Sequence, residues 1–278
     1  MINSVAEELA ASIVRLRDAG VESAQLEAQL LLAHGLQCSR LDIITHPERL
    51  LSAEELSSFR DMIDRRAQRC PFAYIIGHRK FFGLQLIVTP AVLIPRPETE
   101  ILVEEVLRRI PDHAIMADVG TGSGAIAVAV AVSVPKSEIC AIDLSEEALS
   151  VACANAVKHG VANRVNTLQG DLLEGLFPGQ IRFDVIVSNP PYIPTRDIDT
   201  LEIEVRSEPL QALDGGEDGL DIYRKLFVQA LNLTDLIIVE MGTGQSMAIA
   251  RIANEAGWGA IELIRDLAGI ERVLVARP

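Results

Sequence analysis

Apolar residues recur at helical spacing through about the first 75 residues. Ile2, Val5, Leu9, Ile13 and Leu16 stand three or four positions apart, as on one face of an amphipathic helix. A second stripe consists of Leu26, Leu30 and Ala33. A third consists of Leu56, Phe59 and Ile63, and it is preceded by a Ser-x-x-Glu capping box formed by Ser52 and Glu55. No catalytic pattern accompanies these stripes, so we predict that residues 1–73 form a helical bundle for structure or partner binding.

The pattern changes at residues 74–95. Two β-prone runs, Tyr74–Ile76 and Leu84–Val88, are separated by a stretch that contains two glycines. This arrangement predicts a β-hairpin that links two domains.

From Ala114 onward, short apolar runs alternate with helical stretches. The predicted strands are 115–119, 138–142, 183–187 and 236–240, and the predicted helices are 125–132, 145–159, 220–231 and 245–256. Two closing strands, 261–264 and 272–276, are expected to form an antiparallel pair. The alternation predicts an α/β domain over residues 96–278, with a mainly parallel sheet covered by helices on both faces. Ligands of such sheets bind beyond the carboxyl ends of the strands.

The charge balance bears on the partner. The chain has 39 acidic and 25 basic residues, a formal net charge of −14, and no long basic run. Proteins that grip nucleic acid by its phosphates usually present a basic surface. We therefore expect a small-molecule or protein substrate, and we do not expect direct binding to nucleic acid.

The cysteines and the N-terminus point to the cytoplasm. The four cysteines form no C-x-x-C pair and no cluster with zinc spacing, so we expect reduced thiols and no bound metal. The first residues lack the basic start of a signal peptide. No apolar stretch reaches the roughly 18 residues of a membrane span, so no membrane association is expected.

A glycine-rich loop, Asp118–Ala125, follows a predicted strand and opens a predicted helix. Glycines let the backbone turn sharply and approach a ligand closely, and a helix N-terminus offers free N–H groups. A tight turn without a ligand is the structural alternative. Gly120, Gly122 and Ala125 also satisfy the dinucleotide pattern, so this loop alone does not separate NAD from S-adenosylmethionine.

Two acidic residues follow later strands. Asp143 lies about 20 residues beyond the glycine loop, where an ionised carboxylate can accept hydrogens from ribose hydroxyls. Its structural alternative is helix capping before Ser145. Asp171 follows Leu168-Gln169-Gly170 at the end of one further predicted strand and could contact an adenine amino group, although a plain loop aspartate explains it nearly as well.

The sequence Asn189-Pro190-Pro191-Tyr192 after strand 183–187 carries the most chemical information. An amide or aromatic amine is a poor nucleophile because its lone pair is delocalised. A site can overcome this by accepting both N–H hydrogens, here with the Asn189 side-chain carbonyl and the Pro190 backbone carbonyl. The prolines restrict the backbone and preorganise these acceptors, while Tyr192 can pack on a planar amide or base. A proline-stiffened loop with a core tyrosine is the alternative.

Beyond these motifs, the sequence resembles the protein-(glutamine-N5) methyltransferases that modify bacterial peptide chain release factors. The resemblance covers nearly the whole chain, and the segment Ile94–Glu100 is more specific than the shared Asn-Pro-Pro-Tyr motif. The segments that carry it are Tyr74–Gly77, Leu93–Glu100, Asp118–Ala125, Ser188–Tyr192, Val205–Pro209, Leu213–Gly219 and Asp266–Val273.

The resemblance implies a helical bundle at 1–73, a hairpin linker at 74–95, and a Rossmann-like, seven-stranded class I methyltransferase domain at 96–278. It implies S-adenosylmethionine as the cofactor and the Gly-Gly-Gln glutamine of class I release factors as the substrate. The implied cofactor residues are Gly120, Thr121, Gly122, Ser123, Gly124, Asp143, Asp171, Leu172 and Asn189. Asn189, Pro190, Pro191 and Tyr192 are implied to hold the glutamine amide, with Asn189, Pro190 and Tyr192 as the catalytic residues.

Two other functions share parts of this pattern. An adenine-N6 methyltransferase of DNA or RNA uses Asn-Pro-Pro-Tyr for similar hydrogen bonds, but the net charge of −14 and the lack of a basic recognition segment oppose it. An NAD-dependent dehydrogenase or a dinucleotide-binding module would share the glycine loop. The Asn-Pro-Pro-Tyr loop has no role in hydride transfer, so we expect S-adenosylmethionine rather than NAD to bind.

Overall fold

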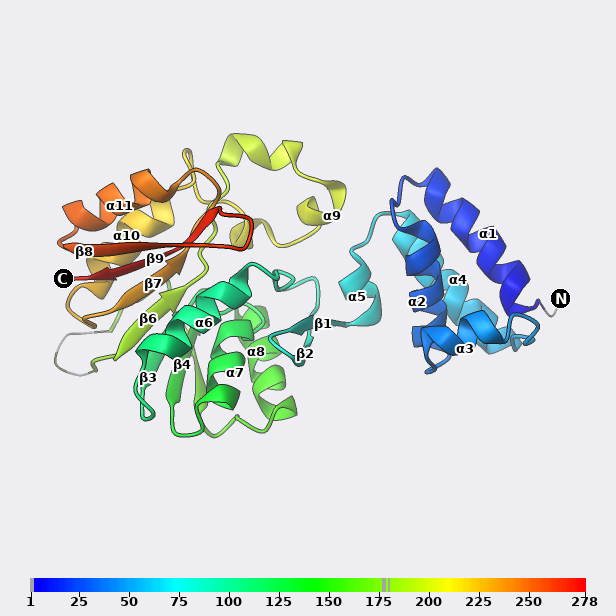
Figure 1. The fold of residues 1–278 in the computed structure, drawn as a ribbon, viewed down its shortest axis with the longest axis horizontal. Coiled ribbons are helices and arrows are strands. Elements are labelled where there is room, and N and C mark those ends of the chain that lie inside the picture. The colour runs from blue at the N-terminus through cyan, green and yellow to red at the C-terminus, as the bar shows by residue number, and fades with distance from the viewer. Residues whose placement is uncertain (1–2, 177–178, 180) are drawn as a thin grey trace. The chain divides into compact units, whose positions relative to one another are not determined.

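The computed structural model describes residues 3–176, 179 and 181–278. The chain divides into two compact units, coloured along the chain in Figure 1. The helical unit contains residues 1–77 and 202–207, and the catalytic unit contains residues 78–201 and 208–278. The chain therefore returns to the helical unit for six residues, an excursion that no pattern in the sequence indicates.

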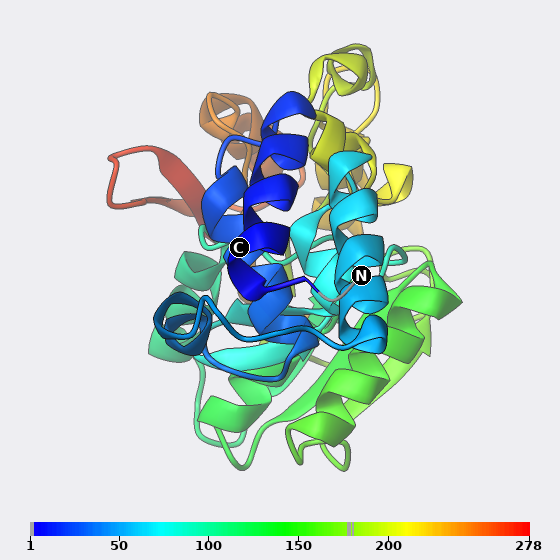
Figure 2. The ribbon, with the colours of Figure 1, turned by 90° about the vertical axis from the view of Figure 1, so that its right-hand side faces the viewer.

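In the described residues, the helical unit is built from five helices of the N-terminal segment and one short helix of the later excursion. The long blue and cyan helices of the N-terminal segment lie alongside one another in Figure 2. The helices of this unit are α1 (Val5–Asp18), α2 (Ala24–Gly35), α3 (Arg40–Thr45), α4 (Ala53–Ala67), α5 (Phe72–Ile76) and α9 (Ile203–Arg206). The predicted stripes on α1 and α4 contribute buried residues to its core, and the Ser52 capping box of α4 is confirmed. Ile2 lies outside the described residues.

The predicted stripe on α2 was right at Ala33, which is buried, and wrong at Leu26, which is 41% exposed. The buried face of this helix also includes Ala28, Leu31 and Leu32. The run Leu30–Ala33 is apolar at every position, so spacing alone could not select the face that packs.

The predicted hairpin exists, but its first strand was misplaced. Residues 74–76 belong to helix α5, which Gly77 ends in a left-handed conformation. The hairpin consists of β1 (His78–Phe81) and β2 (Leu84–Ile87), joined by two residues that both have positive φ. This is the backbone that a tight hairpin turn requires. The β-propensity of Tyr74–Ile76 is overridden because Ile75 packs into the helical core.

A buried side chain of the catalytic unit makes two hydrogen bonds to the hairpin. Asn155 of α8 accepts a hydrogen bond from the Ile87 N–H at 2.6 Å and donates to the Ile87 carbonyl at 2.9 Å. It also donates to the Ser123 carbonyl at 2.8 Å. The hairpin, α8 and the glycine loop are thereby held together, so the hairpin is part of the catalytic unit.

The catalytic unit contains a seven-stranded sheet in the order β5-β4-β3-β6-β7-β9-β8. Its strands are β3 (Ile115–Val119), β4 (Glu138–Asp143), β5 (Val165–Gln169), β6 (Val185–Ser188), β7 (Ile237–Glu240), β8 (Ala260–Arg265) and β9 (Glu271–Arg277). Strands β3 to β7 are parallel to one another, and β9 runs antiparallel to both of its neighbours, β7 and β8. The predicted α/β fold and its antiparallel closing pair are confirmed.

Helices cover both faces of this sheet, as Figure 1 shows. One core cluster joins the sheet to α6, α7 and α8, and the other joins it to α10 and α11. These helices and the two 3-10 turns are α6 (Thr99–Arg109), α7 (Ala125–Ser133), α8 (Glu146–Lys158), α10 (Asp221–Ala230), α11 (Ser246–Glu255), η1 (Thr195–Thr200) and η2 (Leu210–Ala212). Within the described residues, no helix is long and apolar enough to cross a membrane.

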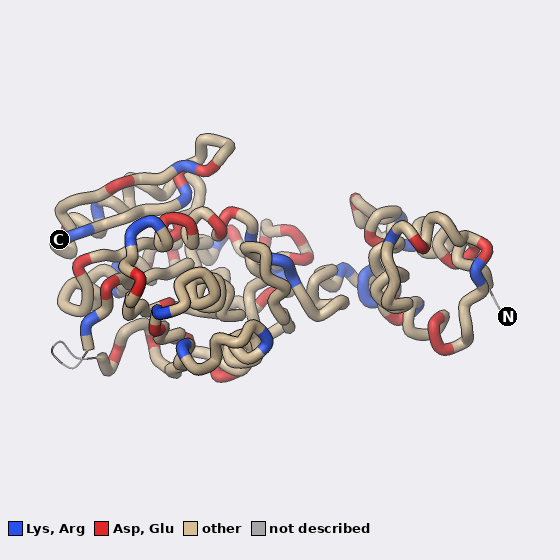
Figure 3. Tube along the Cα trace, turned by 60° about the horizontal axis from the view of Figure 1, so that its bottom comes forward, with Lys and Arg blue, Asp and Glu red and all other residues tan. Residues whose placement is uncertain are grey.

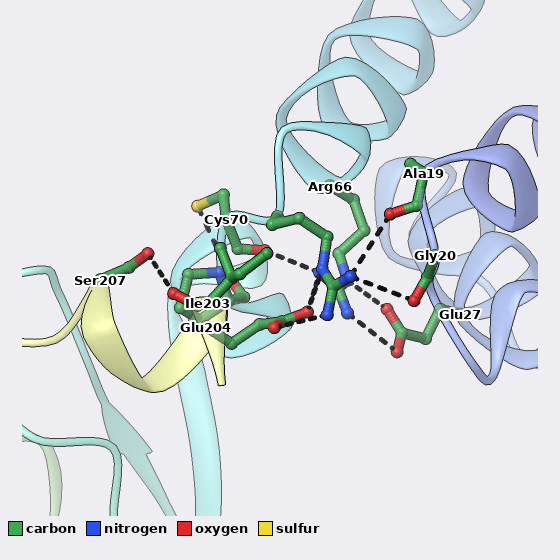
Figure 4. Close-up of polar contacts among 10 residues, drawn as sticks. Ala19, Gly20, Glu27, Arg66, Cys70, Ile203, Glu204 and Ser207 are labelled. Carbon is green, nitrogen blue, oxygen red and sulfur yellow. Dashed lines mark hydrogen bonds and ion pairs between the residues drawn. The ribbon is translucent and has the colours of Figure 1, made fainter. Parts of the chain in front are cut away.

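The short excursion is held to the helical unit by an ion-pair cluster, drawn in Figure 4. Glu204 of α9 accepts hydrogen bonds from Arg69 at 2.7 and 2.8 Å and from Arg66 at 2.9 Å. Arg66 is buried and also binds Glu27 of α2. The carboxylate of Glu204 thus completes the charge balance of two arginines, one on α4 and one just after its end.

Glu204→Gln is expected to destabilise the protein. Burial opposes ionisation of Glu204, but hydrogen bonds from Arg69 and Arg66 outweigh it and lower its pKa to about 2. A lowered carboxyl pKa stabilises the fold above the unfolded value near 4.5, and that stabilisation disappears as the pH falls through about 2. Hydrogen bonds to charged groups contribute about 1.5–3 kcal/mol each, so the melting temperature at pH 7 should fall by several degrees.

Thermal unfolding from pH 7 to pH 3 measures this effect. The difference between wild type and Glu204→Gln should be greatest above about pH 5 and should shrink below it. Glu202→Gln, on an exposed residue of the same segment, is the matched control. Equal melting temperatures for Glu204→Gln and wild type at pH 7 would show that the cluster does not hold the excursion.

Candidate active site

The register of the parallel strands places three candidate residues, and one residue that the sequence did not suggest, at one edge of the sheet. Ile142, Val119, Ser188 and Val239 are consecutive partners across β4, β3, β6 and β7. The next residue on each strand is therefore at the same level, at the carboxyl end: Asp143, Gly120, Asn189 and Glu240. The chain order reverses between β3 and β6, so the glycine loop and the Asn-Pro-Pro-Tyr loop meet at the topological switch point.

The glycine loop leaves open space where side chains would stand. Gly120 and Gly122 have φ of +72° and +54°, and a Cβ added to either residue would meet no atom within 4 Å. Gly124 is different, because a Cβ there would lie 3.0 Å from the Ala152 side chain of α8. Gly124 thus lets the loop pack on α8, whereas Gly120 and Gly122 expose backbone to the adjoining cavities.

The loop is braced from beneath by Asp118, the residue before Val119 in β3. Its Oδ2 accepts hydrogen bonds from the Thr121 hydroxyl at 2.7 Å and from the Ala127 N–H at 3.1 Å. Burial raises the pKa of Asp118 to about 6 despite these bonds. Asp118 therefore supports the loop conformation from the core and does not face the ligand space.

Asp143 reaches from the end of β4 to the glycine loop. Its Oδ2 accepts a hydrogen bond from the Gly122 N–H at 2.8 Å, and its Oδ1 accepts one from the Ser145 N–H at 3.0 Å. The helix-capping alternative holds only in part: Asp143 bonds to Ser145 just before α8, but the side chain that caps α8 is that of Ser145. Each carboxylate oxygen can accept a second hydrogen, so ligand binding remains available to Asp143.

The next loop carries a strained residue. Leu172 has φ +56°, a left-handed conformation that costs a non-glycine residue about 1–2 kcal/mol. The adjacent Leu173 N–H is held by the Gln229 side chain at 2.8 Å, which fixes the loop to α10. Asp171 and Leu172 both line the cavity described next. Strain of this kind is concentrated at functional sites.

A cavity of about 830 Å³, including its part open to solvent, joins these loops. Its walls include Gly120, Gly122, Asp143, Leu172 and Asn189. A smaller cavity on the other side of the glycine loop contacts Thr121, Ser123, Arg96, Thr99 and Asn189. Gly124 and Tyr192 are absent from both walls, as far as the described residues define them.

Asn189 lines both cavities, and one hydrogen bond orients its side-chain amide. Its Nδ2 donates a hydrogen bond to the Thr99 hydroxyl at 3.2 Å. Within the described part of the chain, neither Asn189 Oδ1 nor the Pro190 carbonyl oxygen accepts a hydrogen bond. Two neighbouring acceptors are therefore free at the cavity wall, as the sequence motif predicts for a site that holds an amide NH₂ group.

The backbone after Asn189 is supported by a glycine-containing loop. Ile193 pairs with Asp214 in a parallel bridge, and a Cβ on Gly215 would lie 2.8 Å from the Pro191 carbonyl oxygen. A Cβ on Gly219 would lie 2.3 Å from the Tyr192 carbonyl oxygen, which accepts a hydrogen bond from Gln245 at 2.9 Å. These contacts need glycine, and they fix the backbone that carries the free acceptors.

Sequence reasoning missed two buried residues beside this loop, Thr99 and Glu240. Both are buried: Thr99 accepts the hydrogen bond from Asn189, and Glu240 follows Val239, the strand partner of Ser188. The position of Glu240 at the end of β7 was the available signal, because carboxyl ends of parallel strands meet at the ligand edge. No group of metal-binding side chains is found among the described residues.

The fold and the site together define a class I methyltransferase, and the comparisons agree. Residues 7–77 match the family described as PrmC N-terminal domain, and residues 97–205 match the methyltransferase small domain. A release factor glutamine methyltransferase of Geobacter sulfurreducens is 44% identical over 94% of this chain and 92% of its own. One of Caulobacter vibrioides is 43% identical, with the same coverage of both chains. The chain belongs to the release factor glutamine methyltransferase family.

Solved structures agree on the fold. A methyltransferase from Pyrococcus furiosus has a TM-score of 0.54 and 18% identity, covering 71% of this chain and 90% of that one. The catalytic domain of hMettl16, in complex with the MAT2A 3′UTR hairpin 1, has a TM-score of 0.59 and 14% identity, covering 83% of each chain. The protein is an S-adenosylmethionine-dependent methyltransferase, and the NAD-binding alternative is set aside.

Proposed function

We propose that this enzyme transfers a methyl group from S-adenosylmethionine to the side-chain nitrogen, N5, of the glutamine in the Gly-Gly-Gln motif of class I release factors. The observation that carries the proposal is the pair of free acceptors, Asn189 Oδ1 and the Pro190 carbonyl. Relatives over 40% identical are named release factor glutamine methyltransferases.

The cofactor is assigned to the larger cavity. Asp143 would accept the ribose hydroxyl hydrogens, while Gly120 and Gly122 give a ligand access to the backbone in the open space beside them. Asp171 and Leu172 would border the adenine. Thr121 and Ser123 contact the smaller cavity, where they would face the rest of the cofactor, and Gly124 would act through packing on α8.

The chain's own residues perform the chemistry by alignment. The bound cofactor supplies an electrophilic methyl group on a sulfonium, which is a good leaving group. Asn189 Oδ1 and the Pro190 carbonyl accept the two N–H hydrogens of the glutamine amide, so the nitrogen lone pair points toward the methyl group. The N–C bond forms as the S–C bond breaks, and one amide proton is then lost to solvent.

Pro191 and Tyr192 act beside this step. Pro191 limits the backbone next to the acceptors. Burial, followed by the charge of Glu240, raises the pKa of Tyr192 to about 12, so its hydroxyl stays neutral at physiological pH. Its carbonyl is held by Gln245. Because Tyr192 lines neither cavity in the described part of the chain, we assign it to supporting the loop that carries the acceptors.

The remaining assignments are the kind of substrate, the role of the helical unit and the cellular compartment. Acidic and basic positions are interspersed along both units in Figure 3, and the acidic ones predominate. This distribution favours a protein substrate over DNA or RNA. The helical unit carries no ligand motif, so we assign it to recognition of the release factor. Translation takes place in the cytoplasm, where this enzyme would act.

Methyl transfer from radiolabelled S-adenosylmethionine to a purified class I release factor tests the proposal. We expect incorporation of one methyl group per release factor. Changing the glutamine of its Gly-Gly-Gln motif to alanine should abolish incorporation. Label transferred equally to that variant, or to a DNA or RNA oligonucleotide instead of protein, would refute the assignment.

A further inference from the structure

The loop that carries the two free acceptors is stiff between its ends. It begins at Ser188, the last residue of β6, whose buried hydroxyl donates a hydrogen bond to a carbonyl of β3 at 2.7 Å. The rings of Pro190 and Pro191 fix φ, and a residue that precedes a proline is confined to extended conformations. Few backbone torsions therefore remain free between Asn189 and Tyr192. The direction of the Pro190 carbonyl depends on how the two ends of the loop are held.

The far end of the loop is held at the peptide group between Tyr192 and Ile193. The Ile193 N–H donates to the Leu213 carbonyl at 3.0 Å. On the other side of the same peptide group, the Tyr192 carbonyl accepts a hydrogen bond from Gln245 Nε2 at 2.9 Å. Because the donor and the acceptor of this peptide group are both occupied, its plane cannot rotate without breaking a hydrogen bond. One of the two partners is a side chain, that of Gln245.

The same side chain also holds the surface on which the Tyr192 ring packs. Gln245 Oε1 accepts a hydrogen bond from the Gly242 N–H at 3.0 Å, in the loop between β7 and α11. A Cβ on Gly242 would lie 2.5 Å from Gln245 Oε1 and 3.0 Å from Tyr192 Cδ2, so the ring lies directly against this glycine. Gln245 thus fixes both the backbone at Tyr192 and the glycine that its ring contacts.

The helix that begins beside Gln245 does not explain a glutamine at this position. Gln245 is the N-cap residue of α11, where shorter side chains such as those of serine and asparagine are preferred because they bond to the first helical N–H groups. The Gln245 side chain makes no capping bond and reaches instead to a residue 53 positions earlier. Its amide offers one loop a donor and the other an acceptor, a combination that an ionised carboxylate lacks.

We propose that Gln245 is a positioning residue for methyl transfer: by holding the Tyr192 carbonyl, it fixes the end of the loop that aims the Asn189 and Pro190 oxygens at the substrate amide. The inference rests on the proposed function. In the described part of the chain, Gln245 lines neither cavity. Its loss should therefore disturb the alignment of the substrate amide and spare the affinity for the cofactor.

Gln245→Met removes the donor and the acceptor at nearly constant side-chain length. We expect kcat for a peptide that contains Gly-Gly-Gln to fall about tenfold, the effect of one hydrogen bond on the transition state, because the acceptors are then less well aligned. The Kd of S-adenosylmethionine should stay close to that of wild type. Steady-state kinetics at saturating peptide and isothermal titration calorimetry measure the two quantities.

Thr234→Val is the matched control. The buried Thr234 hydroxyl, like the Gln245 amide, bonds to one backbone N–H and one backbone carbonyl, both of Leu236. These residues precede β7 and so lie at the opposite edge of the sheet from Asn189. The control variant loses a comparable pair of hydrogen bonds and should keep the kcat of wild type.

Gln245→Glu separates positioning from stability. The variant keeps the size of the side chain and its acceptor, but an ionised carboxylate cannot donate to the Tyr192 carbonyl. A protonated carboxyl group can donate, and partial burial opposite a carbonyl oxygen raises the pKa of the introduced carboxyl group above its ordinary value of about 4.3. The kcat of the variant, divided by that of wild type at the same pH, should therefore rise at least about threefold from pH 8 to pH 5.5.

Division by the wild-type value removes the effect of the charged groups around Tyr192, because both enzymes share them. These groups are Glu240, Arg272, Arg96 and Glu98.

Near-normal kcat in Gln245→Met, or a kcat ratio for Gln245→Glu that does not change with pH, would overturn the proposal. So would an equal loss of kcat in Thr234→Val, or a cofactor Kd that rises as steeply as kcat falls, because the effect would then be a general loss of the fold. Failure of the proposed function gives a different result, since wild type itself would not methylate the peptide.

Discussion

Asn189→Ala is expected to lower kcat by about 10²–10³-fold while the fold and cofactor binding persist. Losing one preorganised polar contact to the reacting group costs about 3–4 kcal/mol of transition-state stabilisation. The alanine removes an acceptor from the substrate nitrogen and leaves Thr99 without its donor. Turnover of a Gly-Gly-Gln peptide at saturating cofactor measures the loss, and circular dichroism verifies the fold.

Asn254→Ala is the matched control for this experiment. Asn254 is an exposed residue of α11 whose side chain bonds only to the carbonyl of Ala250 within the described residues. It should retain wild-type turnover. A folded Asn189→Ala enzyme with near-normal kcat would mean that the Pro190 carbonyl aligns the substrate by itself, and the central role of Asn189 would be withdrawn.

The meeting of the glycine loop and Asp143 was predictable because its signals are local. A glycine loop between a strand and a helix, and an acidic residue at the end of the next strand, are each read within a few positions. Parallel pairing then brings them together, since the carboxyl ends of neighbouring strands meet at one edge. Asp143 and Gly122 accordingly share a hydrogen bond of 2.8 Å.

The supports of Asn189 were not predictable because they are non-local. Thr99 opens α6 and meets residue 189 only through the packing of that helix, while Glu240 ends β7 and is placed level with residue 189 by the register of the sheet. The excursion at 202–207 escaped notice for a similar reason. A four-residue helix has no periodicity, and Glu204 becomes meaningful only beside Arg66 and Arg69. Spacing along the chain does not contain these pairings.

The excursion also determines how the helical unit should be tested. Removal of residues 1–72 would leave Glu204 without its two arginines, and the loss of the cluster would obscure any loss of recognition. Point substitutions on the surface avoid this problem. Leu41 and Ile44 are suitable, because they lie three positions apart on α3 and are 66% and 50% exposed.

The double substitution Leu41→Glu/Ile44→Glu is expected to raise KM for an intact release factor about 100-fold and to leave turnover of a short Gly-Gly-Gln peptide unchanged. A glutamine side chain offers little area, whereas stable protein interfaces bury roughly 1,200–2,000 Å². Two apolar contacts worth at least about 1.4 kcal/mol each would account for the expected change. Steady-state kinetics on both substrates measure the ratio.

Val228→Glu is the matched control, because Val228 is 62% exposed on α10 of the catalytic unit. It should leave both KM values near those of wild type. If the α3 variant impairs the peptide and the intact factor equally, the helical unit supports the catalytic fold and does not recognise the substrate. If it impairs neither, recognition lies on another surface of that unit, and Val14 of α1, which is also exposed, is the next position to change.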